Sequence, residues 1–234
     1  MVRNRRRRSE AFLAAGLRIA TEEGIEALTM TRLADALDTA VGSVYRYYAS
    51  KDELIAAIQA HAVGELHCSH DRSVGPVADE LASRVPDESA ALVRVVVLGR
   101  WFCAAAERYP EEVRLLQLVS VRRTPTYTPA AAARLLPTTV AFVAAIADTV
   151  DAAVATGDLK PGPGFTRAIM WLTAFGGVFV ADDLAHYAPA VLGGGRLIRQ
   201  LNVDLLVGWG APPDAVQRIE HAIDALADTS PLLR

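Results

Sequence analysis

Apolar residues recur every three or four positions along most of this sequence, which is the spacing that places them on one face of an α-helix. Alanine and leucine, two strong helix formers, are abundant, and no window shows the sustained apolar–polar alternation typical of a strand. The pattern therefore predicts an all-α protein. Its expected helices cover about 9–24, 30–37, 41–47, 89–108, 129–156, 165–187, 196–209 and 213–227.

Proline and glycine divide this helical pattern, because proline lacks a backbone donor and both residues favour turns. Pro110 is expected to stop the helix that carries Trp101, and Pro137 is expected to kink the helix over 129–156. The remaining breaks are expected at Gly75-Pro76, Pro86-Asp87, 124–129, 157–164 and 193–195.

The window 28–54 predicts two short helices joined by a tight turn. The hydroxyl of Thr29 can cap a helix that starts at the next residue, a break follows at 38–40, and a second helix covers about 41–47. Ser50, followed three residues later by a glutamate, forms a capping box that opens a further helix. Such a helix-turn-helix can place its second helix in the major groove of DNA.

The second helix of this motif ends in an aromatic cluster that is followed three residues later by a lysine. The motif as a whole comprises Gly24, Leu28-Thr29, Leu33-Ala34, Leu37, Gly42-Ser43-Val44-Tyr45-Arg46-Tyr47-Tyr48 and Lys51-Asp52-Glu53-Leu54. In order and spacing, residues 9–66 resemble the DNA-binding end of TetR-type transcriptional regulators. Three turn residues depart from the family: Asp38 stands where Gly is usual, Thr39 where Val is usual, and Ala40 where Ser often caps the recognition helix.

The resemblance implies that Tyr45, Tyr47 and Lys51 meet DNA backbone phosphates, which suits a phenol that donates a hydrogen bond and an ammonium that neutralises charge. Thr31 and Arg32, in the first turn of the helix over 30–37, are further phosphate candidates. The candidate DNA-binding residues are Thr31, Arg32, Val41, Gly42, Ser43, Tyr45, Arg46, Tyr47 and Lys51.

Base edges are expected to face the exposed side of residues 40–46. Gly42 permits close backbone approach, Ser43 can donate or accept a hydrogen bond, and Val41 can contact a thymine methyl group. Arg46 can form a bidentate contact with guanine or bind a phosphate. Tyr48 is expected to lie in the core.

The resemblance also implies a helix-turn-helix domain over 1–55 and a helical regulatory domain over 56–234. The regulatory domain is expected to enclose a ligand cavity and to form a homodimer through helices in about 165–209. An apolar, alanine-rich lining favours a hydrophobic or amphipathic effector, although each candidate could equally be plain core. The candidate ligand-binding residues are Trp101, Phe102, Cys103, Leu116, Tyr127, Phe142, Phe175 and His186.

Charge adds one feature to this picture. The 234 residues carry a net charge of −3, yet residues 1–60 hold nine basic side chains against eight acidic ones, and five of the nine lie within the first eight residues. Arg5 to Arg8 are therefore either a solvated tail or an arm that reaches a DNA groove or backbone. A mildly acidic chain with a basic start indicates an anionic partner at one end.

The remaining observations limit the function. Two cysteines cannot build a disulfide framework, and no uninterrupted apolar stretch of membrane-spanning length is present, so a cytoplasmic protein is expected. A cluster of nitrogen, sulfur and oxygen donors is either a metal site or an exposed polar helix end, and no metal or cofactor is expected. The candidate ligands are His61, His67, Cys68, His70 and Asp71.

No phosphate-binding glycine loop or nucleophile motif indicates an enzyme. The sequence predicts a dimeric repressor that binds a palindromic operator and is released by a small effector. The alternative is a ligand-independent activator or a broad chromosomal DNA-binding protein.

Overall fold

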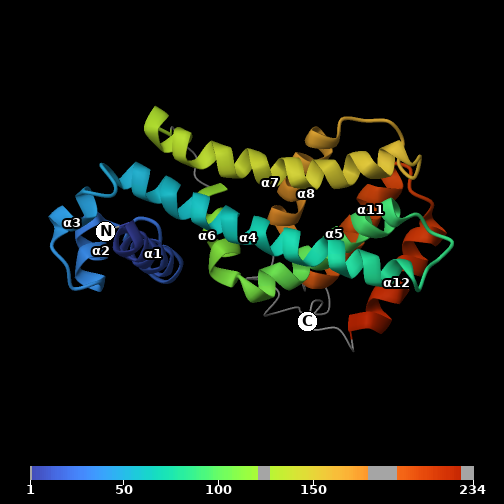
Figure 1. Cartoon of the computed structure of the whole chain (residues 1–234), viewed down its shortest axis with the longest axis horizontal. Helices are drawn as coiled ribbons and strands as arrows, with labels where there is room; N and C mark the ends of the chain where they lie inside the picture. Colours follow the sequence, from blue (N-terminus) through green and yellow to red (C-terminus); the bar gives the residue numbers. More distant parts are fainter. Residues whose placement is uncertain (1, 121–126, 179–193, 228–234) are drawn as a thin grey trace. The chain divides into compact units, whose positions relative to one another are not determined.

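The computed structural model describes residues 2–120, 127–178 and 194–227, and every regular element in those ranges is helical. The prediction of an all-α protein is confirmed. In chain order (Figure 1) the elements are α1 (Val2–Arg18), the π-helical turn η1 (Ile19–Glu23), α2 (Met30–Ala36), α3 (Val41–Tyr45), α4 (Lys51–Ala82), α5 (Ala90–Arg108), α6 (Pro110–Ser120), α7 (Pro129–Ala155), α8 (Gly164–Val178), α11 (Gly194–Gly208) and α12 (Pro213–Ala227).

Several expected boundaries are confirmed. Pro110 separates α5 from α6 and is the first residue of α6, where a missing backbone donor costs nothing. A turn precedes α8, and α12 has the limits read from the sequence. The expected continuation of α8 to residue 187 lies outside the described residues, as do residues 124–126 of the expected loop and residue 193 of the expected break. The other two residues of that break, Gly194 and Gly195, are helical and begin α11.

Two expected boundaries are wrong. The first helix begins at Val2 rather than near Ser9, so the arginine-rich segment is helical. The break at Gly75-Pro76 does not form, because α4 continues through Pro76 to Ala82. Val74, Val77 and three further apolar residues of this segment are buried or half-buried, and their packing outweighs the one backbone hydrogen bond that a proline removes.

The chain divides into two compact units, which are described separately. Unit 1 comprises Met1–Leu66 and Tyr109–Ala141, and unit 2 comprises His67–Arg108 and Phe142–Arg234. Both α4 and α7 contribute residues to each unit. The expected domain limits at 55 and 56 stay a prediction.

The core of unit 1 is formed by α1, α2, α3 and the start of α4, with one side chain from α6. Its largest fully buried members are Phe12, Leu28, Leu33, Leu54, Ile58 and Leu115. Each of these side chains contributes roughly 2 kcal/mol of hydrophobic stabilisation. This core holds the two helices of the helix-turn-helix at a fixed angle to α1.

The core of unit 2 is organised around α5, which packs against α11 and α12. Gly99 of α5 lies directly against Asn202 of α11, where a β-carbon would come within 2.5 Å of the amide group. The fully buried Asn202 donates to the carbonyl of Val96 at 3.1 Å and accepts from the indole nitrogen of Trp171 at 3.0 Å. A buried amide with both polar atoms bonded therefore fixes the register of α5, α8 and α11.

Among the described residues, one helix, α7, is long and apolar enough to cross a membrane by length and composition alone. Core helices of water-soluble proteins satisfy the same criterion, so this observation carries little weight.

Candidate DNA-binding site

The helix-turn-helix has the local geometry that its residues predict. The hydroxyl of Thr29 accepts a hydrogen bond from the backbone of Arg32 at 3.0 Å, which confirms Thr29 as the cap of α2. Asp38 adopts a left-handed backbone with φ of 45°, a conformation that aspartate tolerates better than most residues. Asp38 thus supplies the turn that glycine usually supplies in the resembled family, and α3 starts three residues later without a side-chain cap.

Aromatic packing fixes the end of the recognition helix α3. Phe12 of α1 makes edge-to-face contacts with Tyr47 and Tyr48, at ring-centroid distances of 5.2 and 6.4 Å. Tyr48 is 2% exposed and its hydroxyl lies 3.3 Å from that of Ser9, so its predicted place in the core is confirmed. Burial raises the pKa of Tyr48, which keeps the phenol protonated.

The exposed face of α3 carries the candidate contacts to DNA. Tyr45 is 53% exposed, and Gly42 has open space around it. Arg46 is exposed and donates to the hydroxyl of Ser43 at 2.8 Å. Ser43 itself is buried, which places it below Arg46 rather than at the surface. The structure therefore brings Tyr45, Gly42 and Arg46 to one accessible surface.

Three further DNA-binding residues predicted from the sequence differ from one another in how far their side chains are exposed. Thr31 is exposed in the first turn of α2, whereas Val41 and Tyr47 are half-buried and pack against the core of unit 1. Val41 and Tyr47 hold α3 in place, and only their outer edges can reach a ligand.

The two remaining cations of the site are ion-paired within unit 1. Arg32 binds the carboxylate of Glu23 through two nitrogens, and this guanidinium lowers the pKa of Glu23. Lys51 donates to the carbonyl of Glu26 at 3.1 Å and lies 3.6 Å from its carboxylate. DNA phosphates must therefore compete with carboxylates for both cations. Sequence reasoning missed these partners, because 9 and 25 residues separate the members of the pairs.

The arginines of α1 extend this surface. Arg5 to Arg8 are exposed on the first turns of α1, and Arg8 donates to the hydroxyl of Thr39 at 2.8 Å. The guanidinium of Arg5 lies 5.8 Å from the ring centroid of Tyr47. The expected basic arm is thus a helical extension that contacts the turn and the end of α3. No single feature of the sequence indicated the contact between Arg8 and Thr39.

Four of the candidate ligand-binding residues form one aromatic cluster in unit 2. Trp101 contacts Phe102 and Phe142, and Phe102 contacts Phe175, with centroid distances between 5.4 and 6.0 Å. Trp171 joins the cluster against Phe175 at 4.1 Å. All of these rings are buried.

The other four candidates lie elsewhere. Leu116 is in α6 and Tyr127 precedes α7, both in unit 1, where the hydroxyl of Tyr127 bonds to the amide of Gln59. Cys103 is half-buried in unit 2, where burial raises the pKa of its thiol to about 11. His186 lies outside the described residues. The described candidates are therefore divided between the two units, with Leu116 and Tyr127 in unit 1 and the others in unit 2.

A histidine of α4 adds a polar group to the aromatic cluster. His70 is 7% exposed and stands edge-to-face against Trp101 at 5.3 Å. Its Nδ1 lies 3.0 Å from Asp71, which also faces His67 at 3.6 Å, and burial lowers the pKa of His70. Within the described ranges, no three His, Cys, Asp or Glu side chains are grouped as metal ligands would be. The donors considered as metal ligands instead include one carboxylate, that of Asp71, which lies beside the imidazoles of both His67 and His70.

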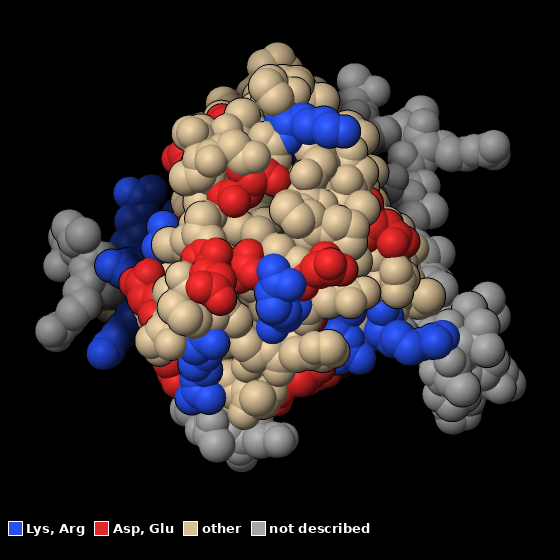
Figure 2. Space-filling view, turned by 90° about the vertical axis from the view of Figure 1, so that its right-hand side faces the viewer, with Lys and Arg blue, Asp and Glu red and all other residues tan. Residues whose placement is uncertain are grey.

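Unit 2 also contains a charged cluster between α5 and α12. Arg100 lies 2.7 Å from Asp224 and 3.8 Å from Glu220, whose side chain is only 14% exposed. Burial raises the pKa of Glu220 to about 7. The face shown in Figure 2 carries acidic and basic side chains interspersed among uncharged ones.

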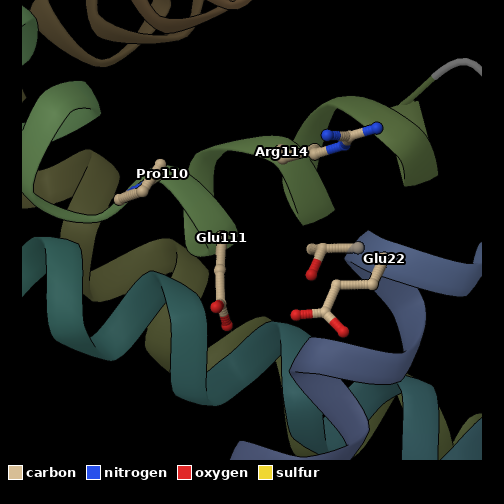
Figure 3. A pocket seen from close by; sticks show the side chains of 5 residues that line it. Glu22, Pro110, Glu111 and Arg114 are labelled. Atoms are coloured by element: carbon tan, nitrogen blue, oxygen red, sulfur yellow. The ribbon is translucent and has the colours of Figure 1, made fainter.

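A pocket of about 370 Å³ lies between η1 and α6 in unit 1. In Figure 3 the carboxylates of Glu22 and Glu111 point toward one another across it, while Arg114 points away. Thr21 and Pro110 complete the lining, and the hydroxyl of Thr21 already donates to a backbone carbonyl. None of the candidate ligand-binding residues lines this pocket.

A tight two-helix motif that presents an exposed α3, beside arginines and a lysine, defines a helix-turn-helix DNA-binding protein. Residues 12–58 match the family model described as bacterial regulatory proteins, tetR family. Residues 12–58 are therefore similar to TetR-family regulators, and the resemblance read from the sequence is confirmed over this part of the chain.

One relative and two solved structures illustrate the likeness. The chain is 37% identical over 68 residues to the HTH-type transcriptional repressor KstR of Mycobacterium tuberculosis (strain ATCC 25618 / H37Rv), a match that covers 29% of this chain and 31% of KstR. The fatty acid degradation regulator FadR of Bacillus halodurans superimposes with a TM-score of 0.58 at 12% identity, over 84% of this chain and 97% of FadR.

FadR of Bacillus subtilis in complex with stearoyl-CoA superimposes with a TM-score of 0.57 at 10% identity, over 82% of this chain and 96% of that protein. At such identities the two structural likenesses establish the fold. The chain spans about a third of the length of KstR, the curated relative that it matches.

Proposed function

We propose that this protein is a homodimeric transcriptional repressor of the TetR type, which binds a palindromic operator and is released by an apolar or amphipathic effector. The observation that carries the proposal is the accessible surface of α3, where Tyr45 and Arg46 stand free of the core beside the arginines of α1. Tyr45 and Lys51 are assigned to phosphates, and Arg46 is assigned to base edges. The site acts in the cytoplasm, where the operator lies.

Dimerisation is supported by an apolar stripe on α8. Phe165, Ile169 and Met170 are 44%, 46% and 51% exposed, which is unusual for large apolar side chains on one helix. Ala168, Trp171 and Phe175 of the same helix are buried within unit 2, so they are not available to a second copy of the chain. The proposed interface therefore uses the opposite face of α8. A twofold dimer presents two recognition helices to two half-sites.

The proposed effector has a long apolar portion. Support comes from the aromatic cluster around Trp101 and Phe175, and from the FadR structure that contains stearoyl-CoA. Effector binding is proposed to favour a dimer whose recognition helices no longer match successive major grooves, with a coupling free energy of about 1–3 kcal/mol.

The experiment is a selection of duplexes from a random library with the full-length chain, followed by titration of stearoyl-CoA into the selected complex. An inverted repeat with half-sites about one helical turn apart is expected, together with release by the acyl thioester. If no sequence is enriched, the proposal that the protein binds an operator is refuted. An inverted repeat that acyl-CoA esters leave bound would favour a ligand-independent regulator, the alternative expected from the sequence.

A further inference from the structure

The end of the recognition helix is held from a second side by an arginine of α7. Nη2 of Arg134 lies 3.5 Å from the carbonyl of Tyr47 and 3.3 Å from Oε2 of Glu53. Its guanidinium also lies 5.8 Å from the ring centroid of Tyr48. One side chain therefore contacts the residues that follow α3, the tyrosine that anchors them, and the first turn of α4.

These contacts fall where a short helix is weakest. α3 has only five residues, so its last carbonyls have few partners within the helix. A cation near helical carbonyl ends is electrostatically favourable. Phe12 and Arg5 of α1 contact Tyr47 from their own helix, so Arg134 supplies a contact from a different element.

Further contacts keep this part of α7 beside α4 within unit 1. The amide of Gln59 and the hydroxyl of Tyr127 exchange hydrogen bonds at 3.0 and 3.2 Å. Gly64 of α4 lies against Thr138 of α7, since a β-carbon there would be 3.8 Å from the threonine methyl group. The position of Arg134 is therefore determined by packing and hydrogen bonds as well as by its exposed ion pair.

We propose that Arg134 is a positioning residue for the recognition helix, so that α7 contributes to DNA sequence discrimination without touching DNA. The inference rests on the proposed function. α7 runs on from Arg134 into unit 2, where Phe142 joins the aromatic cluster. The orientation of α3 thus depends on a helix that also belongs to the regulatory part of the chain.

The test compares Arg134→Gln with Arg84→Gln, a matched control in which an arginine of similar exposure loses a glutamate partner in unit 2. In Arg134→Gln the ratio of affinities for the selected duplex and a random duplex is expected to fall about tenfold or more, because a misplaced α3 loses base contacts while phosphate contacts persist. Arg84→Gln should leave the ratio unchanged. Equal losses on both duplexes, or no loss, would overturn the positioning role.

Arg134→Lys separates geometry from charge. Lysine keeps the positive charge but has no planar guanidinium to lie against the ring of Tyr48 while one nitrogen reaches the carbonyl of Tyr47 and the carboxylate of Glu53. The affinity ratio of Arg134→Lys is expected to stay at least about threefold below that of the wild type. A ratio equal to the wild-type value would assign the effect to charge alone and overturn the inference.

Hydrogen exchange tests the same inference without DNA, so it remains decisive even if no operator is found. Amides of residues 44–50 are expected to exchange at least about threefold faster in Arg134→Gln than in the wild type or Arg84→Gln, because a local contact has been lost. Unchanged exchange would overturn the positioning role. A wild-type chain that selects no DNA would instead refute the proposed function.

Discussion

Tyr45, Arg46 and Lys51 are assigned to different parts of the DNA, so their substitutions are expected to affect binding in two different ways. Tyr45→Phe and Lys51→Ala should weaken binding to the selected and the random duplex by similar factors, since both residues are assigned to phosphates. Arg46→Ala should also lower the ratio of the two affinities, by about tenfold, since a bidentate base contact contributes roughly 1–3 kcal/mol of discrimination. Fluorescence anisotropy titrations of both duplexes check this.

The matched control for these substitutions is Arg108→Gln, an exposed arginine at the end of α5 in unit 2. It should leave both affinities unchanged. If Arg46→Ala, Tyr45→Phe and Lys51→Ala all reduce the two affinities equally, the assignment of Arg46 to base edges is wrong.

At the residue scale, local chemistry was predictable and long-range partners were not. The cap at Thr29 and the buried position of Tyr48 follow from spacing within a few residues. The contacts of Arg32 with Glu23, Lys51 with Glu26, and Arg134 with Glu53 join different elements. Exposed ion pairs of this kind leave no periodic pattern in a sequence, because many polar residues could serve as the partner.

At the scale of elements, the arginines of α1 lead to a prediction of how operator binding depends on salt concentration. Deletion of residues 2–8 should make operator binding less dependent on salt. The plot of log K against log salt has a negative slope, and each lost phosphate contact makes that slope less steep by about 0.9. The triple variant R5Q/R6Q/R7Q should act in the same direction while keeping α1 intact. The measurement is a titration at several salt concentrations. An unchanged slope in both variants would mean that these arginines do not contact DNA phosphates.

The packing of α12 on α5 predicts a dependence of stability on pH. Glu220 has its pKa raised to about 7, so between the ordinary pKa of a glutamate and about 7 the folded protein binds a proton that the unfolded chain has released. The free energy of unfolding should therefore fall as the pH rises through this window. Above the window, the ionised and buried carboxylate costs up to about 3 kcal/mol.

Glu220→Gln should remove this cost. From about pH 5 to about pH 8, the free energy of unfolding of the variant should rise relative to the wild type by up to about 3 kcal/mol. Denaturant titrations at both pH values measure the difference, and Glu107→Gln, at an exposed position of α5, serves as the control. A constant difference between Glu220→Gln and the wild type would show that the carboxylate is already ionised at low pH.

Helix boundaries were predictable from the sequence where the local effect of a proline or glycine agrees with the packing of the neighbouring side chains. Pro110 stands at a helix start, and α12 matches its expected limits. Gly75-Pro76 lies inside α4, because buried apolar neighbours on both sides stabilise a continuous helix. The segment before Ser9 is helical although it holds four consecutive arginines, because Arg8 and Arg5 find partners on the helix-turn-helix. Neither partner could be read from periodicity.

At the scale of the whole molecule, the exposed stripe on α8 predicts how two copies associate. Ile169→Lys should shift the protein from dimer to monomer in sedimentation experiments, because a charge placed in an apolar interface loses its hydration. The control Leu136→Lys places the same charge at an apolar position of similar exposure on α7. If Ile169→Lys remains dimeric and Leu136→Lys does not, the interface lies on α7.

The faces of α8 could not be told apart from sequence, since both are apolar. Trp171 and Phe175 on one side and Phe165 and Ile169 on the other satisfy the same helical spacing. The positions of α11, whose Asn202 is bonded to Trp171, and of α5, whose Phe102 contacts Phe175, decide which side is internal. The same reason explains why the candidate ligand residues are divided between units: large apolar side chains indicate burial but not their neighbours.

The measurement that tests the central claim most directly is an equilibrium titration of the full-length chain against two duplexes of equal length at one salt concentration. One duplex is the inverted repeat recovered by selection, and the other is its scrambled counterpart. Sequence recognition by α3 predicts affinity for the inverted repeat that is about a thousandfold or more tighter. Equal affinities would contradict the account, because the chain would then bind only the DNA backbone.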